Sequence, residues 1–369
     1  MKTLYVNGKF LSQTTTGVQR YAAGVVEAWD NDLDSGRIDP SAYSIRLIVP
    51  KTDKEIPRFK RITVAPSVLR GKLWEQVELP LRSAGGLLFS PYAAAPVFKS
   101  RQIVTIHDAG VAATPEQYST LFRGYYAAVY RSLGRYCISL VTDSQFSKQE
   151  LHKYFSIPFD KLIVIPPGCD HLLKVPPSPD ILNRFALEPG KFILGVSSQS
   201  PIKNFDGLAK AWKLLGRPEL KLAIAGKTNN RVFGHGATVL DSQVACLGYV
   251  SDGELRTLYE NASAFVYPSF YEGFGIPPLE AMTCGCPVVV ARSSALPESC
   301  GDAALYCDPS SPGDIAGNIA SLLDNPILAQ RMRMLGRLQA AQFTNQAAAS
   351  QLWAEIQKYS VRFYESVSS

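Results

Sequence analysis

The sequence predicts an α/β protein made of two doubly wound, Rossmann-like domains that face each other across a cleft. With 369 residues, the chain exceeds the roughly 100 to 200 residues that one domain usually holds. Short β-branched apolar runs alternate with helical patterns, as in repeated βα units around a parallel sheet. A proline-rich stretch at residues 174–180 separates the halves like a stiff linker. We therefore expect an N-terminal domain over residues 1–175 and a C-terminal domain over residues 176–345.

The first half of the chain contains a helical pattern at residues 17–29 and several short apolar runs. Ser147 and Glu150 have the spacing of a capping box for a helix that follows Thr142. We expect buried strands at residues 4–6, 44–49, 87–90, 103–107, 140–142 and 162–165.

The second half repeats the strand and helix pattern more regularly. The expected strands are residues 192–196, 220–225, 244–247, 264–267 and 287–291, and the expected helices are residues 206–215, 252–261, 278–284 and 312–324. A last helix, near residues 346–364, carries more apolar surface than a free tail would keep exposed. We expect this C-terminal segment, residues 346–369, to cross to the N-terminal domain and dock there.

Composition and charge limit the cellular compartment and the classes of binding partner that we expect. No run approaches the roughly 18 to 20 apolar residues of a membrane-spanning helix, and the first residues lack a secretory signal, so we expect a cytoplasmic protein. Residues 1–180 carry 22 Lys and Arg against 16 Asp and Glu, whereas the rest carries 16 of each. This excess suits anionic phosphates or an anionic membrane surface, and the alternative is a merely solvated face. We expect no nucleic-acid partner.

Seven cysteines without C-x-x-C spacing indicate reduced, mostly buried thiols.

The strongest candidate for a ligand-binding motif runs from Glu272 to Glu280. It follows a predicted strand, contains Gly273 and Gly275, and opens a helix whose first turn holds prolines. A helix N-terminus at the carboxyl edge of a sheet attracts a phosphate or a developing anion. Carboxylates at both ends suit sugar or ribose hydroxyl groups, because a charged acceptor makes such a bond worth about 1.5 to 3 kcal/mol. The alternative is an ordinary capped surface helix.

This segment resembles the glycine-loop and two-glutamate motif of the family-4 retaining glycosyltransferases, which have the GT-B fold. Further likeness lies in residues 142–147, 165–170, 296–298, 301–304 and 308–309. The resemblance implies that Glu272 contacts the transferred sugar and that Glu280 contacts the ribose of the nucleotide. It also implies that the backbone amides of Phe274, Gly275 and Ile276 hold sugar hydroxyl groups.

Three further positions gain a role through the same resemblance. Lys203 matches the family's diphosphate lysine, although residues 197–199 hold no arginine where many relatives have one. Gly17 resembles the N-terminal glycine loop that meets the donor phosphate. His107 ends a predicted strand, and the resemblance implies that it hydrogen-bonds the transferred sugar. Alternatively, Lys203 is an exposed surface lysine, Gly17 is part of an ordinary helix start, and His107 is a histidine of the core or of its rim.

Several segments match only part of other known binding motifs. The segment 226–228 lacks the leading glycine of a phosphate loop, and the segment 234–239 lacks the last glycine of the dinucleotide fingerprint. Asp30-Asn31-Asp32 matches a D-x-D metal motif but ends a predicted helix, so we interpret it as a solvated turn. We predict no metal ion and no cofactor besides the nucleotide-sugar substrate.

The resemblance implies a retaining, metal-independent hexosyltransferase. The expected reaction moves mannose from GDP-mannose onto a lipid-linked or oligosaccharide acceptor in bacterial surface polysaccharide (lipopolysaccharide) synthesis. Peripheral contact with the inner face of the membrane is expected through basic N-terminal residues: Arg58, Lys60, Arg61, Arg70 and Lys72. The alternatives are another donor (UDP-glucose, UDP-N-acetylglucosamine or GDP-fucose), a sugar-nucleotide epimerase on the same fold, and a non-catalytic module that binds nucleotide sugars.

Overall fold

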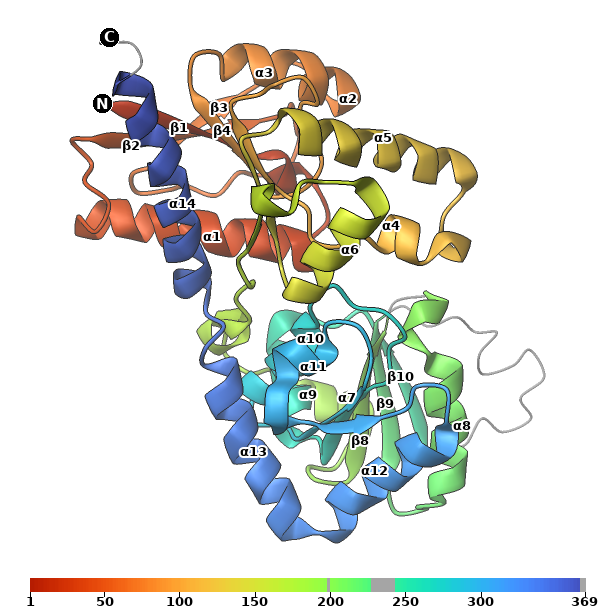
Figure 1. Ribbon diagram of the computed structural model, residues 1–369. Coiled ribbons are helices and arrows are strands. Elements are labelled where there is room, and N and C mark those ends of the chain that lie inside the picture. Colours follow the sequence, from red (N-terminus) through yellow and green to blue (C-terminus); the bar gives the residue numbers. More distant parts are fainter. Residues whose placement is uncertain (198–199, 227–242, 366–369) are drawn as a thin grey trace. The chain divides into compact units, whose positions relative to one another are not determined.

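The computed structural model describes residues 1–197, 200–226 and 243–365. The chain divides into two compact units (Figure 1). Unit 1 comprises Met1–Gly168 together with Asn345–Ser369, and unit 2 comprises Cys169–Thr344. Each unit is built around its own parallel sheet, which confirms the predicted α/β class with two Rossmann-like sheets.

Unit 1 holds a seven-stranded sheet in the order β3-β2-β1-β4-β5-β6-β7, with every neighbouring pair parallel. The edge strand β3 was absent from the sequence prediction, because its half-exposed residues form no apolar run. The strands are β1 (Lys2–Asn7), β2 (Tyr43–Val49), β3 (Thr63–Pro66), β4 (Leu87–Ser90), β5 (Gln102–Thr105), β6 (Ser139–Thr142) and β7 (Leu162–Val164).

The helices of unit 1 connect these parallel strands. They are η1 (Lys9–Ser12), α1 (Gly17–Ser35), α2 (Gly71–Leu73), the π-helical turn η2 (Trp74–Glu78), α3 (Leu79–Arg82), α4 (Gly110–Ala113), η3 (Pro115–Gln117), α5 (Thr120–Tyr136), α6 (Gln145–Phe155) and η4 (Phe159–Lys161). The predicted capping box at Ser147 and Glu150 is wrong. Helix α6 begins earlier, and the Ser144 hydroxyl caps it by accepting a hydrogen bond from the Ser147 N–H at 2.9 Å.

The C-terminal helix α14 (Asn345–Glu365) packs beside α1 in unit 1 (Figure 1). Leu352, Trp353 and Ile356 belong to the apolar core that α1 forms with β1, β2 and β4. The indole N–H of Trp29, on α1, donates to the Ala349 carbonyl at 3.0 Å, and the Trp29 and Trp353 rings meet edge to face. This confirms that the C-terminal helix docks on the N-terminal domain.

Unit 2 holds a six-stranded parallel sheet in the order β10-β9-β8-β11-β12-β13. Its strands are β8 (Phe192–Ser197), β9 (Lys221–Gly226), β10 (Val244–Gly248), β11 (Ala264–Tyr267), β12 (Val288–Ala291) and β13 (Leu305–Cys307). Its helices are η5 (Asp170–Lys174), α7 (Asp180–Arg184), η6 (Pro201–Lys203), α8 (Phe205–Leu215), α9 (Asp252–Asn261), α10 (Ile276–Thr283), α11 (Leu296–Cys300), η7 (Gly301–Ala303), α12 (Pro312–Asp324) and α13 (Pro326–Ala340).

The contact boundary between the units falls between Gly168 and Cys169, before the proline-rich stretch at which we placed it. The Cys169 N–H donates to the Phe343 carbonyl at 2.9 Å, and the following helix η5 packs against α9 and α10. These contacts attach the residues just before the proline-rich stretch to unit 2.

The interpretation of Asp30-Asn31-Asp32 as a solvated turn is wrong. Both aspartates lie within α1, and their side chains are buried. Asp30 accepts hydrogen bonds from the backbone N–H groups of residues 60–62 at 2.7 to 2.9 Å. Asp32 accepts from Arg37 at 2.6 Å and from Gln346 at 2.9 Å. The two carboxylates therefore hold neighbouring segments of unit 1 in place. The segments 227–228 and 234–239 lie outside the described residues.

None of the seven cysteines takes part in a disulfide bond, and six of them are buried. This confirms the interpretation of the cysteines as reduced core residues. Only Cys246, on β10, is exposed.

Candidate functional site

The order of the sheet in unit 2 identifies where a ligand belongs. Strands β8 and β11 are neighbours, and the chain leaves them toward opposite edges of the sheet. In doubly wound sheets, ligands bind outside the carboxyl ends of the strands at such a topological switch point. Lys203 follows β8, and Glu272 follows β11. The two predicted residues therefore flank the switch point from both sides.

Lys203 and Glu272 form the central ion pair of this site. The Lys203 ammonium lies 2.6 Å from Glu272 Oε1 and donates to the Tyr267 hydroxyl at 2.9 Å. Burial by itself lowers the pKa of Lys203, but Tyr267 and Glu272 raise it by more, so the net pKa lies above its ordinary value. Lys203 is therefore a permanent cation at the carboxyl edge of the sheet.

Asn204 fixes the loop that carries this lysine. Its backbone is left-handed, with a φ of 54°, and its side-chain oxygen caps α8 by accepting from the Gly207 N–H at 3.2 Å. The side-chain amide donates to the Pro268 carbonyl at 3.0 Å and to the Pro309 carbonyl at 2.6 Å. One buried side chain thus joins the loops after three strands of unit 2.

A second set of hydrogen bonds positions Glu272. Its N–H donates to the Ser294 hydroxyl at 2.9 Å, and the Phe270 N–H donates to the Ile202 carbonyl at 2.8 Å. The loops that carry Lys203 and Glu272 are therefore fastened to each other through their backbones. Sequence reasoning missed Asn204, Tyr267 and Ser294 as positioning residues, since their partners lie 22 or more residues away.

The glycine loop places the N-terminus of α10 at the same carboxyl edge of the sheet in unit 2. Gly275 is left-handed, with a φ of 103°, and a Cβ atom there would lie 2.6 Å from a methyl carbon of Leu296. Helix α10 begins at Ile276, followed by two prolines that have no N–H. No residue that the structure describes accepts a hydrogen bond from the N–H of Phe274, Gly275 or Ile276. These are donors of the kind that an anion or hydroxyl group binds at a helix N-terminus.

Glu280 lies one turn into α10 and is buried at 6% exposure. The Tyr259 hydroxyl donates to its Oε2 atom at 3.3 Å, and His171 Nε2 lies 3.4 Å from its Oε1 atom. Burial and the Glu280 carboxylate raise the pKa of Tyr259 well above its ordinary value, so this tyrosine stays a neutral donor. His171 stands directly after the segment 165–170, yet sequence reasoning did not single it out.

His107 lies in unit 1, after β5. Its Nδ1 atom is 2.9 Å from Asp143 Oδ2, and its Nε2 atom is 3.2 Å from the Pro91 carbonyl. Both partners only accept hydrogen bonds, so this arrangement requires a proton on each ring nitrogen. Burial lowers the pKa of His107, but the Asp143 carboxylate raises it by more, and the net pKa is above its ordinary value. The structure therefore favours an imidazolium, with Asp143 as a partner that sequence reasoning had not assigned.

Gly17 is the first residue of α1, and it is exposed. Thr16 and Gln19 form a capping box around it. Gly17 and His107 lie in unit 1, while Lys203, Glu272 and Glu280 lie in unit 2. In unit 2, the structure brings Lys203 and Glu272 into contact, while Glu280 contacts Tyr259 and lies beside His171. Ser198 and Gln199, from the lysine loop, lie outside the described residues.

The site in unit 2 lies within a region that is similar to known enzymes. Residues 180–339 match the family model described as glycosyl transferases group 1. The chain is 33% identical over 261 residues to the O-antigen chain mannosyltransferase B of Escherichia coli, an alignment that covers 66% of this chain and 67% of that one. The chain belongs to the glycosyl transferase group 1 family. It is also 28% identical over 211 residues to the O-antigen chain mannosyltransferase RfbU of Salmonella typhimurium, covering 56% of this chain and 57% of that relative.

A solved structure confirms the GT-B glycosyltransferase fold. The sucrose-phosphate synthase of Thermosynechococcus elongatus superposes with a TM-score of 0.73 over 97% of this chain and 99% of that chain, at 19% identity. In the part of this glycosyltransferase that the structure describes, no helix is both long and apolar enough to span a bilayer. No group of His, Cys, Asp and Glu side chains among these residues is arranged to hold a metal ion.

Proposed function

We propose that this glycosyltransferase is a retaining, metal-independent enzyme that moves mannose from GDP-mannose onto a lipid-linked or oligosaccharide acceptor in surface polysaccharide synthesis. The carrying observation is the Lys203–Glu272 pair at the switch point of unit 2, together with the N–H groups of Phe274, Gly275 and Ile276. The choice of mannose rests on the two relatives, which are both O-antigen mannosyltransferases.

Each element of the site has a task in this reaction. The Lys203 cation and the N-terminus of α10 would stabilise the departing diphosphate, where a preorganised charge commonly supplies about 3 to 4 kcal/mol. Glu272 would accept a hydrogen bond from the transferred sugar. Glu280, which accepts a hydrogen bond from Tyr259 and lies beside His171, would accept from the ribose. The departing phosphate takes the acceptor proton, so retention requires no enzyme nucleophile or base.

The two positions in unit 1 keep their proposed roles in donor binding. His107 would hydrogen-bond the transferred sugar through Nε2, the atom that lies 3.2 Å from the Pro91 carbonyl. An imidazolium at this position would also attract the negatively charged donor. The amide at Gly17 would meet the donor phosphate at the start of α1.

The test is a donor panel of GDP-mannose, UDP-glucose, UDP-N-acetylglucosamine and GDP-fucose, with released nucleotide measured in the presence of a lipid-linked acceptor. We expect the highest turnover with GDP-mannose, unchanged turnover after EDTA treatment, and retained anomeric configuration by proton NMR. Clear preference for another donor would refute the mannose assignment. An altered sugar formed without acceptor would indicate an epimerase, and nucleotide binding without any product would indicate a non-catalytic module.

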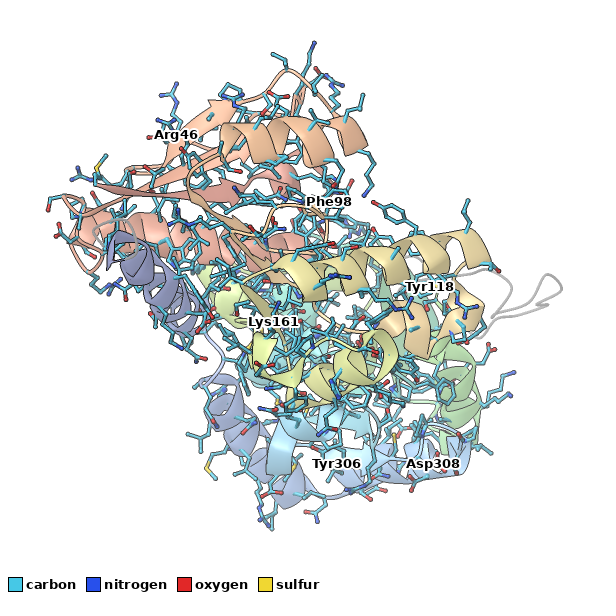
Figure 2. The ribbon with its side chains drawn as sticks, turned by 45° about the horizontal axis from the view of Figure 1, so that its top comes forward. Arg46, Phe98, Tyr118, Lys161, Tyr306 and Asp308 are labelled. Atoms are coloured by element: carbon cyan, nitrogen blue, oxygen red, sulfur yellow. The ribbon has the colours of Figure 1, made fainter. Side chains whose placement is uncertain are left out.

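We also propose a peripheral position at the cytoplasmic face of an anionic membrane. On the continuous helix α2–η2–α3, Leu73, Val77 and Leu81 recur every fourth residue and are 66%, 47% and 69% exposed. Residues at this spacing share one helix face, which is apolar and open to solvent. Phe98 is 84% exposed and projects from the surface of unit 1 (Figure 2). An apolar face with cations beside it is typical of helices that lie in a membrane interface.

The five basic residues named from the sequence contribute unequally to this surface. Lys60 and Arg61 both contact Asp34, at 3.4 and 3.2 Å, and Arg70 contacts Asp53. Lys72 contacts Glu75 at 2.8 Å, lies 4.8 Å from the ring centre of Tyr125 on α5, and remains 54% exposed. Exposed ion pairs reduce the local field, so the apolar face carries more of the expected affinity than the net charge does.

Flotation on vesicles rich in phosphatidylglycerol tests this position. Leu73→Gln combined with Leu81→Gln should reduce the membrane partition constant by about a hundredfold or more, because each leucine contributes about 1.5 kcal/mol or more on burial. Ile327→Gln is the matched control, since Ile327 is 83% exposed on α13 of unit 2. Equal flotation on neutral and anionic vesicles would contradict the proposal.

A further inference from the structure

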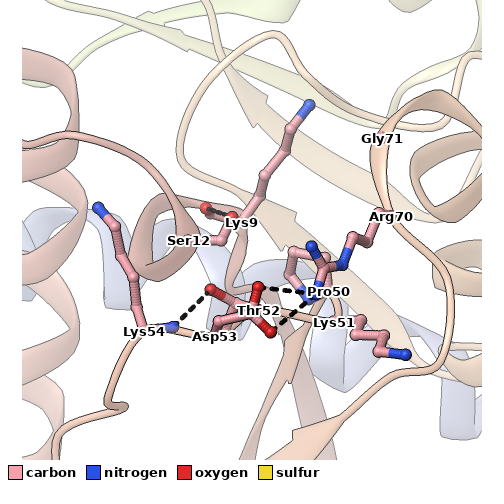
Figure 3. Close-up of a pocket in the computed structure, with 9 residues that line it drawn as sticks. All are labelled: Lys9, Ser12, Pro50, Lys51, Thr52, Asp53, Lys54, Arg70 and Gly71. Carbon is pink, nitrogen blue, oxygen red and sulfur yellow. Dashed lines mark hydrogen bonds and ion pairs between the residues drawn. The ribbon is translucent and has the colours of Figure 1, made fainter.

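Unit 1 contains a pocket of about 470 Å³ at the carboxyl ends of β1, β2 and β3 (Figure 3). This volume lies in the range of about 300 to 1,000 Å³ that small-molecule sites occupy. Each of the three loops that follow these strands lines the pocket. The lining residues are Lys9, Ser12, Pro50, Lys51, Thr52, Asp53, Lys54, Arg70 and Gly71.

The lining is strongly basic. Each loop contributes at least one cation: Lys9 after β1, Lys51 and Lys54 after β2, and Arg70 after β3. Asp53 is the only carboxylate among the lining residues. Four positive charges around one negative charge give a concave surface that attracts an anion, because a cleft focuses the field of its charges.

The cations keep donors for a ligand even where they have protein partners. The Lys9 ammonium donates to Glu75 at 2.7 Å, and the Lys54 ammonium donates to the Gln13 carbonyl at 2.6 Å. An ammonium has three N–H donors, so two remain on each lysine. Arg70 contacts Asp53 through a single nitrogen, at 3.0 Å from both carboxylate oxygens, which leaves the rest of its donor fork uncommitted.

The geometry around Asp53 shows how a ligand would enter. Lys54 and Arg70 lie on opposite sides of Asp53 in Figure 3. The Arg70–Asp53 pair is 54% and 86% exposed, and such pairs hold together weakly in water. A dianion with several acceptor oxygens can therefore displace Asp53 from Arg70. Guanidinium and ammonium groups are the donors that bind the oxygens of a phosphoryl group in proteins.

We propose that this pocket is a phosphoryl-binding site in unit 1, separate from the donor site assigned to unit 2. The phosphoryl group has two sources with the same chemistry: a phosphorylated acceptor, and the headgroup of an anionic phospholipid. Binding of the anion does not depend on the identity of the sugar that the enzyme transfers, so it can succeed or fail independently of the proposed function.

The experiment is calorimetric titration of the full chain with mannose 1-phosphate, with mannose as the uncharged probe. We expect binding of the phosphate ester alone, and a loss of affinity of at least about tenfold in Lys54→Ala combined with Arg70→Ala, since each removed contact is charge-assisted. Arg131→Ala, an exposed arginine on α5, removes the same kind of charge elsewhere in unit 1 and should leave the affinity unchanged.

Asp53→Asn provides the opposite perturbation. It removes the competing carboxylate and releases Arg70, so the affinity for mannose 1-phosphate should increase severalfold. A purely structural role of these residues would not produce opposite changes in the two variants. Weaker binding in Asp53→Asn would overturn the proposal.

Two further arms separate the sources and the sites. Lys203→Ala should keep mannose 1-phosphate binding, and the Lys54→Ala and Arg70→Ala double variant should keep GDP binding. Flotation on phosphatidylglycerol vesicles reports the lipid source, and titration with mannose 1-phosphate reports the acceptor source. The proposal fails if neither measurement changes in the double variant, or if Lys203→Ala alone abolishes binding of the phosphate ester.

Discussion

The Lys203–Glu272 pair predicts that Glu272→Gln separates turnover from nucleotide binding. The substitution keeps the size of the side chain and a hydrogen-bond acceptor, but it removes the charge that lies 2.6 Å from the lysine ammonium. Glu272 contacts the Lys203 ammonium, so a diphosphate that binds this cation competes with Glu272 for it. Glutamine removes this competition, while it also weakens the contact with a sugar hydroxyl group.

The magnitudes follow from the exposure and the charge of the two groups. A hydrogen bond to a charged acceptor contributes about 1.5 to 3 kcal/mol, so kcat/KM should fall by about 10- to 150-fold. The side chains of Lys203 and Glu272 are 23% and 11% exposed, so water screens the pair in part. With a pair worth about 1 kcal/mol or less, the affinity for GDP should stay unchanged or rise by up to about fivefold.

The assay compares Glu272→Gln with Glu280→Gln. Nucleotide release from GDP-mannose gives kcat/KM, calorimetric titration with GDP gives the affinity without a sugar, and thermal unfolding verifies that both variants are folded. Glu280→Gln should weaken GDP binding by about 10- to 150-fold, because its carboxylate is assigned to the ribose. If both variants lost the same GDP affinity, the separate roles of the two carboxylates would be refuted.

Three other outcomes are expected. The raised pKa of His107 stabilises the fold below about pH 6.5, and this contribution is lost as the pH rises through the raised value. In Asp143→Asn, the unfolding free energy measured with urea should therefore fall less as the pH rises above about 6.5. Gly275→Ala should lower the unfolding free energy by at least about 1 to 2 kcal/mol in the same assay, owing to its left-handed backbone and the contact with Leu296. Trp353→Ala should cost about 3 to 5 kcal/mol in chemical denaturation, and a cost below 1 kcal/mol would contradict the docking of α14.

The elements that the sequence predicted well have strong local signals. The central strands of both sheets are continuous apolar runs, because a parallel strand is buried on both faces. The glycine loop was predicted from Gly275 and the prolines that follow it, whose backbone requirements are local. The short strands β3 and β13 were missed, since partly exposed strands of three or four residues carry little pattern.

The sequence by itself determined the fold class, the motif from Glu272 to Glu280 and the helical C-terminus, because each depends on residues that are close together in the chain. Only the tertiary structure decided which side chains meet. It paired Glu272 with Lys203, Glu280 with His171, and His107 with Asp143. It also buried the carboxylates of Asp30 and Asp32 and gathered the basic pocket from three separate loops. The physical reason is that parallel strands bring their carboxyl ends to one edge of a sheet, whatever the distance between them in the chain.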